Sequence, residues 1–276
     1  MNKEEYDIII EAGKAQNDYW KNIWRFRELF YFMAWRDLLV RYKQTIIGVA
    51  WSVIRPLLTM LAFVIVFGKV AKLDSHGVPY PILVFAALLP WQLFSSSLAE
   101  ASNSLVTNSN IISKIYFPRV IIPLSSIIVC LVDFLFSLII FIIMLLFYKF
   151  KLTINAIFLP GFMIMALFSA IGVSLWLSAL TVKYRDFRYV VPFIVQFGLY
   201  ISPVGFDSSH IPERWRYIYS LNPIVGVIDG FRWCLLGGPS TFYWPSFITS
   251  LVSIVVLLVI GINYFRATER TFADKI

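Results

Sequence analysis

Apolar residues in this chain gather into long runs that alternate with short polar segments. Each run is close to the roughly 20 residues that an α-helix needs to cross the hydrocarbon core of a bilayer. Six runs meet this criterion: 46–68, 81–99, 120–148, 156–182, 189–206 and 244–265. The pattern predicts an all-α integral membrane protein with six transmembrane helices. Pro90, Pro123, Pro160 and Pro192 fall inside these runs, where they mark kinks or helix starts.

Residues 20–43, just before the first run, have a different pattern, with aromatic and basic residues at helical spacing. On a helical wheel most of the aromatic residues share one arc and most of the charged residues share the other. The pattern predicts an N-terminal amphipathic helix in the membrane interface. The alternative is a soluble helix packed on a core. The separation is imperfect, because Arg27 and Arg41 fall on the apolar side and Leu29, Phe32 and Leu39 on the polar side.

Residues 207–243 mix polar loop signals with three apolar pieces, 218–221, 224–228 and 233–236, which are too short to cross a bilayer. Prolines and glycines interrupt them: Pro203, Pro212, Pro223, Gly226, Gly230, Gly237 and Gly238. This predicts short re-entrant helices between spans 5 and 6, which are tolerated only where protein or a water-filled cavity satisfies the backbone. The alternative is an ordinary external loop with a helix on the membrane surface.

Composition agrees with a membrane protein, with 59% hydrophobic and only 14% charged residues. Residues 1–17 are polar and carry several acidic side chains, so they lack the pattern of a cleaved signal peptide. With six spans and a cytoplasmic N-terminus, the inner segments hold 16 Lys and Arg residues and the outer segments hold 7. Because basic residues are retained on the cytoplasmic side, this bias predicts that both termini are cytoplasmic. It also accounts for the net charge of +8 without a nucleic-acid partner.

Two kinds of site are excluded by the residues themselves. The sequence contains no G-x-x-x-x-G-K-[ST] phosphate loop, so this chain does not bind ATP in the usual way. Cys130 and Cys234 have no paired spacing, and His76 and His210 lie in predicted outer loops far from a second ligand. We therefore expect no catalytic, cofactor-binding or metal site in this chain.

Four blocks of sequence resemble, in the same order, those of ABC-2-type permeases that export polysaccharides. They are residues 35–51 (WRDLLVRYKQTIIGVAW) with Pro56 and Leu57, residues 113–119 (SKIYFPR) with Pro123, residues 184–187 (YRDF), and residues 221–224 (LNPI) with 229–232 (DGFR). Together the blocks cover the whole length of the chain, which makes the resemblance specific.

The resemblance implies the transmembrane subunit of an ATP-driven exporter in the bacterial inner (cytoplasmic) membrane. Its substrate would be a lipid-linked polysaccharide, an O-antigen, capsule or teichoic acid carried on polyprenyl pyrophosphate. The chain would act as a homodimer with two copies of a cytoplasmic ABC ATPase, which bind the ATP and Mg. The alternative is an ABC-2 exporter of a small drug or lipid. A membrane enzyme or channel is disfavoured because the sequence shows no metal-ligand cluster and no serine–histidine pair.

The apolar runs and the resemblance together divide the chain into three parts. Residues 1–45 form the cytoplasmic N-terminus and interface helix, residues 46–265 the six-span domain with a gate segment at 207–243, and residues 266–276 a cytoplasmic tail. In the gate segment the family blocks place Asn222, Pro223, Asp229 and Arg232.

The loop after the second run combines apolar and polar residues in a pattern that suits a short helix docked in a partner's groove. The resemblance implies that it docks on the ATPase. The expected contact residues are Asn110, Ile111, Lys114, Tyr116, Phe117, Pro118 and Arg119, together with Arg185 and Asp186. For Arg185 and Asp186 the alternative is that they pair and cap the turn before the fifth run.

Two further sets of residues fit a lipid-linked glycan. Arginine and lysine donate hydrogen bonds to phosphate, so the expected contacts of the lipid headgroup are Arg25, Arg36, Arg41 and Lys43. Aromatic rings stack on the C–H faces of sugars, so the expected channel residues are Tyr42, Trp51, Tyr80, Phe197, Tyr200 and Phe206. For each aromatic residue the alternative is the interfacial belt or lipid-facing packing. Asp133, inside the third run, is interpreted as hydrogen-bonded across helices rather than as a proton carrier.

Overall fold

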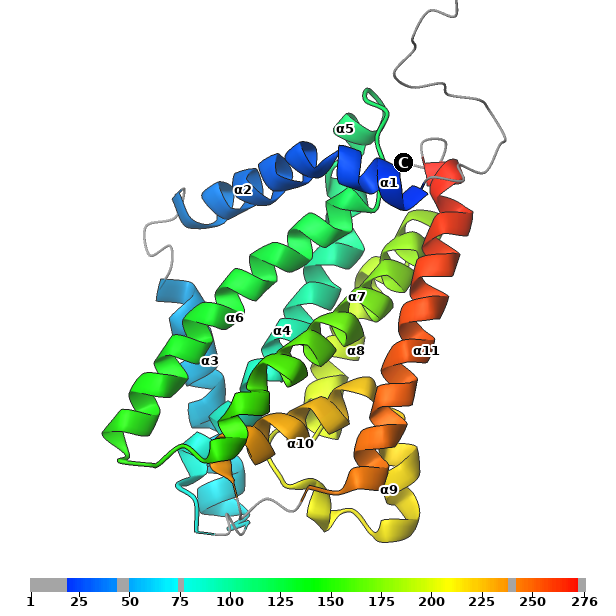
Figure 1. Ribbon diagram of the computed structural model, residues 1–276. Helices are drawn as coiled ribbons and strands as arrows, with labels where there is room; N and C mark the ends of the chain where they lie inside the picture. Colours follow the sequence, from blue (N-terminus) through cyan, green and yellow to red (C-terminus); the bar gives the residue numbers. More distant parts are fainter. Residues whose placement is uncertain (1–18, 44–49, 74–76, 238–241, 273–276) are drawn as a thin grey trace, which may run out of the picture.

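The computed structural model describes residues 19–43, 50–73, 77–237 and 242–272, and the regular elements of these residues are all helical (Figure 1). The all-α class predicted from the sequence is confirmed. Parts of the predicted segments lie outside the described residues: 1–18 and 44–45 of the N-terminal segment, 46–49 of the first run, 74–76 of the six-span domain, 238–241 of the gate segment and 273–276 of the tail.

Within the described residues, five helical segments are long and apolar enough to cross a membrane. They are α3 (Ala50–Phe63) with the π-helix η1 (Val64–Val70), α4 (Tyr80–Thr107), α6 (Ile121–Phe147), the 3-10 helix η2 (Ile154–Phe158) with α7 (Leu159–Lys183), and α11 (Trp244–Thr268) with η4 (Glu269–Thr271). The fifth run forms a shorter helix, α8 (Phe187–Ile201), of 15 residues. At 1.5 Å per residue α8 is about 22 Å long, less than the roughly 30 Å of a bilayer core.

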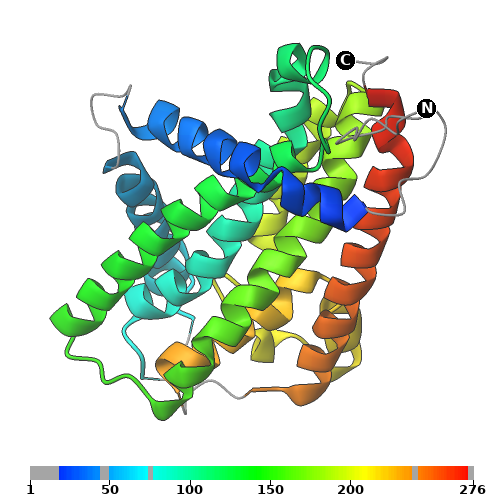
Figure 2. The same cartoon turned by 45° about the horizontal axis from the view of Figure 1, so that its top comes forward.

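α4 is the central helix of the bundle and contacts α3, α6, α7, α8 and α10 (Figures 1 and 2). Its first half is apolar on every side, and Phe85, Leu88 and Leu89 are almost fully buried. A helix that is apolar all round is stable where neighbours cover each of its faces. This burial makes α4 the fixed wall against which the functional side chains are arranged.

α7 and α11 pack closely where Gly172 meets Gly261. A Cβ atom added to Gly172 would lie 2.8 Å from the Cα atom of Leu258, and one added to Gly261 would overlap the Gly172 carbonyl. Small residues at a helix crossing let two backbones approach each other. The contact fixes α11 beside α7.

α1 (Tyr19–Arg25) and α2 (Arg27–Lys43) lie across one end of the bundle, at a steep angle to the long helices (Figure 1). α5 (Ser109–Ile112) and the end of α11 lie at this same end, here called the α2 end. α9 (Glu213–Tyr219) lies at the opposite end, here called the α9 end. The predicted helix at 20–43 is therefore two helices, separated at Phe26, whose half-buried ring packs against the apolar cluster beneath.

The face of α2 that packs on the bundle coincides only in part with the apolar arc of the helical wheel. Met33 is buried and Arg41 is turned inward, whereas Tyr31 and Trp35 are 68% and 50% exposed. The wheel ranks residues by polarity alone, but Asp133 on α6 offers Arg41 a partner inside the bundle. α2 consequently has one packed face and one exposed aromatic face.

The segment after α8 folds into short helices at the α9 end: η3 (Ser208–His210), α9 and then α10 (Pro223–Leu236), which turns back into the bundle against α4, α7 and α11. The expectation that Gly226 and Gly230 interrupt this segment is wrong, because α10 is continuous through both. The glycines serve close packing instead. A Cβ atom on Gly226 would lie 2.6 Å from that of Ser250, and one on Gly230 would overlap the ring of Phe162.

Candidate functional site

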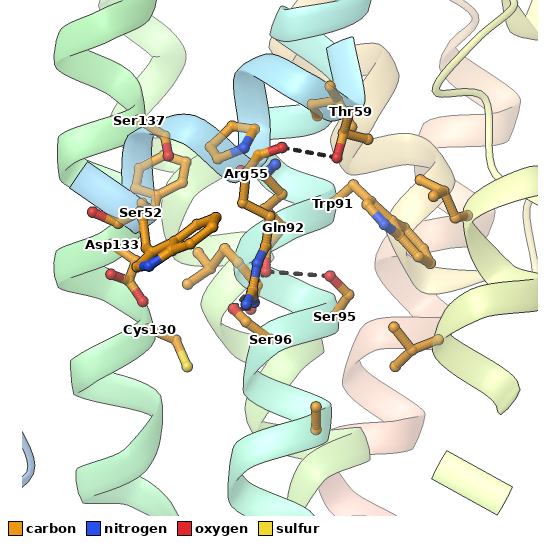
Figure 3. Close-up of a pocket in the computed structure, with 18 of the residues that line it drawn as sticks. Ser52, Arg55, Thr59, Trp91, Gln92, Ser95, Ser96, Cys130, Asp133 and Ser137 are labelled. Atoms are coloured by element: carbon orange, nitrogen blue, oxygen red, sulfur yellow. Dashed lines mark hydrogen bonds between the residues drawn. The ribbon is translucent and has the colours of Figure 1, made fainter. Parts of the chain in front are cut away.

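A cavity of about 410 Å³ lies between α3, α4, α6 and α8, beside the last residues of α2 (Figure 3). Its walls combine apolar side chains with many polar ones, although the helices that form them are strongly apolar. The polar and aromatic lining residues are Arg41, Tyr42, Trp51, Ser52, Arg55, Thr59, Trp91, Gln92, Ser95, Ser96, Asp133, Ser137 and Gln196. Intramembrane polar residues are costly, so their convergence on one cavity indicates a functional site.

The polar lining follows from helical spacing within otherwise apolar runs. On α3, Arg55 and Thr59 are four residues apart, and the Thr59 hydroxyl donates to the Arg55 carbonyl at 2.9 Å (Figure 3). On α4, the Ser96 hydroxyl donates to the Gln92 carbonyl at 2.6 Å. Residues four positions apart share one helix face. Each helix therefore turns a polar stripe toward the cavity and leaves its other faces apolar.

The α2 end of the cavity is closed by a cluster around Asp133. The guanidinium of Arg41 lies 3.2 Å from one carboxylate oxygen of Asp133, and the Tyr42 hydroxyl donates to the other at 2.5 Å. Burial and the Asp133 carboxylate raise the pKa of Tyr42, which keeps its hydroxyl a donor. Arg41 also approaches Glu100 on α4, at 3.5 Å. The cluster thus joins α2, α4 and α6.

The predicted channel aromatics fall into three places. Tyr42 and Trp51 line the cavity. Phe197 and Tyr200 lie on the exposed face of α8, where the ring of Phe193 stacks on that of Phe197 at 5.8 Å. Tyr80 and Phe206 lie near the α9 end. There the Tyr80 hydroxyl donates to the Gly205 carbonyl, and the Phe206 carbonyl accepts from Arg232.

The exposed face of α8 carries more aromatic residues than the sequence prediction singled out. Tyr189, Phe193, Phe197 and Tyr200 recur at near-helical spacing and are each more than half exposed. Such a stripe is stable in contact with lipid, with another subunit or with a ligand that stacks on rings.

The predicted headgroup residues do not form one site. Arg41 belongs to the cavity, whereas Arg36 donates to Asp37 and to Asn108. Arg36 and Lys43 line a separate shallow hollow on α2, with Phe32, Trp35, Leu39 and Val40 as its apolar floor. Arg25 is exposed on α1 and lines neither the cavity nor this hollow.

The predicted ATPase-contact residues divide by exposure. Asn110 is exposed and Ile111 half-buried on α5, and Lys114 and Tyr116 are exposed at the tip of the loop between α5 and α6. Phe117 and Pro118 are buried, and Arg119 is held by Glu269 at the end of α11. Arg185 and Asp186 are exposed in the turn between α7 and α8. The exposed members all lie at or near the α2 end, and the buried ones support them from below.

In the gate segment, Arg232 is almost fully buried. Its guanidinium donates to the carbonyls of Phe206 and Val204, at 2.7 and 3.0 Å, and so holds the non-helical residues that follow α8. Asp229 accepts from the Ser208 hydroxyl at 2.7 Å. Burial raises the pKa of the Asp229 carboxyl to about 7, and the same burial lowers the pKa of Arg232. Asn222 caps α10 by accepting from the backbone of Ile224, and Pro223 opens the helix.

The sequence prediction missed Arg55, Gln92 and Gln196 as parts of the site. The signal was present, because each is a polar residue inside an apolar run, and Gln92 is followed by two serines at helical spacing. What the sequence could not supply was the direction in which each helix is turned. No group of three or more His, Cys, Asp or Glu side chains that could hold a metal ion occurs among the described residues.

Comparison of the sequence with known proteins gives a match to one family and to several individual proteins. A family model described as "ABC-2 type transporter" matches residues 28–236. The chain is 28% identical over 240 residues to an O-antigen export system permease protein RfbA of Klebsiella pneumoniae, covering 87% of this chain and 91% of that protein. It is 24% identical to a protein of the same name from Myxococcus xanthus, covering 93% and 98%. It is 21% identical to the polysialic acid transport protein KpsM of Escherichia coli, covering 85% and 91%.

Proposed function

The chain belongs to the ABC-2 type transporter family, and from this premise we propose that it is the membrane subunit of an exporter of lipid-linked polysaccharide. The relatives named above are permeases of O-antigen and polysialic acid export, and they are matched over almost their whole lengths. The substrate class is therefore a glycan on a lipid carrier, polyprenyl pyrophosphate, in the inner membrane of a bacterium.

The energy source must lie in another protein. Because this sequence has no phosphate loop, ATP and Mg bind to a separate cytoplasmic ATPase, present in two copies with two copies of this chain. Asn110 on α5, the exposed loop tip with Lys114 and Tyr116, and the turn with Arg185 and Asp186 form the docking surface for that ATPase. All three project from the same region of the bundle, as one partner surface requires.

Six crossings are favoured over five by the positions of the two described ends. The hydroxyl of Tyr19 donates to Glu269 at 2.9 Å, so the described part of the chain begins and ends at the α2 end. A chain that begins and ends on one side crosses an even number of times. The five long segments give an odd number, and α8 supplies the sixth crossing when extended by residues 202–206, which Arg232 holds in place. Because the Lys and Arg bias predicts cytoplasmic termini, the α2 end is then the cytoplasmic side.

α1 and α2 act as the interface helix. Trp20, Trp24, Tyr31 and Trp35 are exposed on one face, with Arg25 and Lys43 beside them, which suits the boundary between headgroups and acyl chains. Arg36 and Lys43, at the shallow hollow on α2, are placed to contact lipid phosphate.

The cavity between α3, α4, α6 and α8 is the observation that carries the proposal. Arg41 and Arg55 can donate to a pyrophosphate, Gln92 and the serines can bond sugar hydroxyls, and Trp51 can stack on a ring. The aromatic face of α8 continues from this cavity toward the α9 end and provides a surface along which a glycan slides without one tight site. α10 and the residues held by Arg232 form the outer gate.

To test this proposal, the chain is expressed with its ATPase in cells that lack the native permease, and surface glycan and lipid-linked glycan are measured. We expect surface glycan with the chain and accumulation of lipid-linked glycan without it. Trp51→Ala should slow export by about two- to tenfold, since a stacking contact contributes about 0.5–1.5 kcal/mol. Trp244→Ala, an equally exposed tryptophan at the α9 end and outside the cavity, is the matched control. Accumulation of a small compound or free lipid instead of glycan would overturn the proposal.

A further inference from the structure

Glu269 lies where three segments that are distant in sequence meet at the α2 end. One carboxylate oxygen accepts from the Tyr19 hydroxyl at 2.9 Å, and the other accepts from the backbone N–H of Arg119 at 2.5 Å. Tyr19 begins α1, Arg119 ends the loop before α6, and Glu269 follows α11. A single side chain therefore bridges residues that are 250 and 150 positions away from it.

Two further contacts reinforce this junction. The Arg119 guanidinium donates to the backbone carbonyl of Glu269, so Arg119 and Glu269 are joined through both side chain and backbone. The guanidinium of Arg266, one turn earlier on α11, lies 4.6 Å from the ring centroid of Tyr19. Tyr19 is thus held by its hydroxyl and by its ring.

The junction rests on a buried apolar cluster that involves the same segments. Phe265 and Phe272, on either side of Glu269, contact each other edge to face at 5.3 Å. They are almost fully buried with Met33 of α2, with Ile112 of α5 and with Phe117 of the loop between α5 and α6. Because packed interiors deform little, a displacement of one of these segments moves its neighbours. The described end of the chain is therefore a packed element of the α2 end.

The loop that Glu269 holds also carries an exposed tip. Ile115 and Tyr116 are 57% and 50% exposed, only three or four residues before Arg119. A force applied at the tip is transmitted to Arg119 along a short, partly buried stretch of chain, since Phe117 and Pro118 between them are buried.

We propose that Glu269 is a positioning residue that ties the loop between α5 and α6 to α1, so that movement of the loop tip carries the interface helices with it. This rests on the proposed function, in which the ATPase docks on that loop. Without the tie, ATP hydrolysis continues but its motion reaches α1 and α2 incompletely. Glu269 accordingly sets the number of glycans exported per ATP rather than the rate of hydrolysis.

The first test measures ATP hydrolysis and glycan export together, with the chain and its ATPase reconstituted in liposomes. Glu269→Ala removes both acceptors, and Tyr19→Phe removes one hydrogen bond while keeping the ring over Arg266. We expect both to lower the glycan exported per ATP, by about fivefold for Glu269→Ala, while hydrolysis changes little. Glu269→Gln keeps acceptor oxygen and should retain most of the ratio. Thr271→Val, on the same 3-10 helix, removes a hydroxyl that donates to the nearby Thr268 carbonyl, and is the matched control.

A purely structural role for Glu269 predicts a different result. Hydrolysis and export would then fall in proportion to the loss of folded complex, with an unchanged ratio, and that outcome would overturn the proposal. An unchanged ratio of exported glycan to hydrolysed ATP in fully folded Glu269→Ala would also overturn the proposal.

A second measurement does not depend on the substrate. Spin labels at Lys21→Cys on α1 and Ser113→Cys on the exposed loop before α6, outside the predicted contact residues, report whether the two segments move together, and both native cysteines are buried. In the wild-type background we expect the same label-to-label distance with and without ATP, and in Glu269→Ala a distance that changes on ATP binding. If the label-to-label distance responds to ATP in the same way in the wild type and in Glu269→Ala, the tie is contradicted even if no glycan is exported. Failure of export by the wild-type complex, with the label result intact, would instead overturn the proposed function.

Discussion

Tyr42 and Asp133 are 91 positions apart in the sequence, and the phenol of the first donates to the carboxylate of the second at 2.5 Å. The same carboxylate lies 3.2 Å from Arg41. Through these two contacts the end of α2, which lies across the bundle, is anchored to the middle of α6. This anchor defines the wall of the cavity that faces the α2 end.

Removing the charge of Asp133 should weaken this anchor. Asp133→Asn keeps an acceptor for Tyr42 but leaves Arg41 without its nearer carboxylate, and we expect the free energy of unfolding to fall by about 1–3 kcal/mol. The thermal midpoint of the purified chain measures the change. Glu100→Gln is the control, because Glu100 is half exposed and 3.5 Å from Arg41, and surface pairs of this kind contribute little. Equal losses in the two variants would refute a special role for Asp133.

A side chain at Gly230 should not fit. A Cβ atom there would overlap the ring of Phe162, which is itself buried and packs edge to face on the rings of Phe242 and Phe247. We expect Gly230→Ala to destabilise the protein by about 1–3 kcal/mol through overpacking. Gly161→Ala, on the neighbouring helix α7 with nothing within 4 Å of its added Cβ atom, should be neutral or slightly stabilising. The two thermal midpoints give the comparison, and similar values would argue against a close approach of α10 to Phe162.

Arg232 should be required for the non-helical stretch after α8. Arg232→Met leaves the carbonyls of Val204 and Phe206 without their donor, and we expect a loss of about 2–4 kcal/mol with faster proteolysis between α8 and α9. Arg214→Met removes an exposed arginine of α9, whose guanidinium lies 5.7 Å from the ring centroid of Trp215, and should change neither quantity. Undiminished protection of residues 202–212 in Arg232→Met would show that other contacts hold this stretch.

The Asp229 carboxyl should make stability depend on pH. Burial raises its pKa to about 7 from an ordinary value of 3.8, so the folded protein keeps a proton that the unfolded chain releases. The free energy of unfolding therefore falls as pH rises from about 4 to about 7, by at most about 1.4 kcal/mol per pH unit. In Asp229→Asn this component is absent. Thermal midpoints measured across this range should diverge between the two proteins, and parallel curves would contradict the raised pKa.

The sequence by itself determined that the chain folds into helices and where the long apolar ones lie, because the length of an apolar run and its prolines and charges are local properties. It also contained the polar residues of the cavity, such as Gln92 and Asp133, as interruptions in apolar runs. It also predicted Lys114, Tyr116 and Arg185 as contact residues, and these side chains are exposed in the structure.

The tertiary structure alone decided how each helix is turned about its axis and which distant residues meet. Arg41 faces inward because Asp133 is there to receive it, and α10 runs unbroken through Gly226 and Gly230 because Ser250 and Phe162 press against those positions. Glu269 gave no signal in the sequence, since its role arises only when α1, the loop before α6 and the end of α11 come together. Rotation and long-range contact depend on the packing of all the helices at once, and no local pattern encodes them.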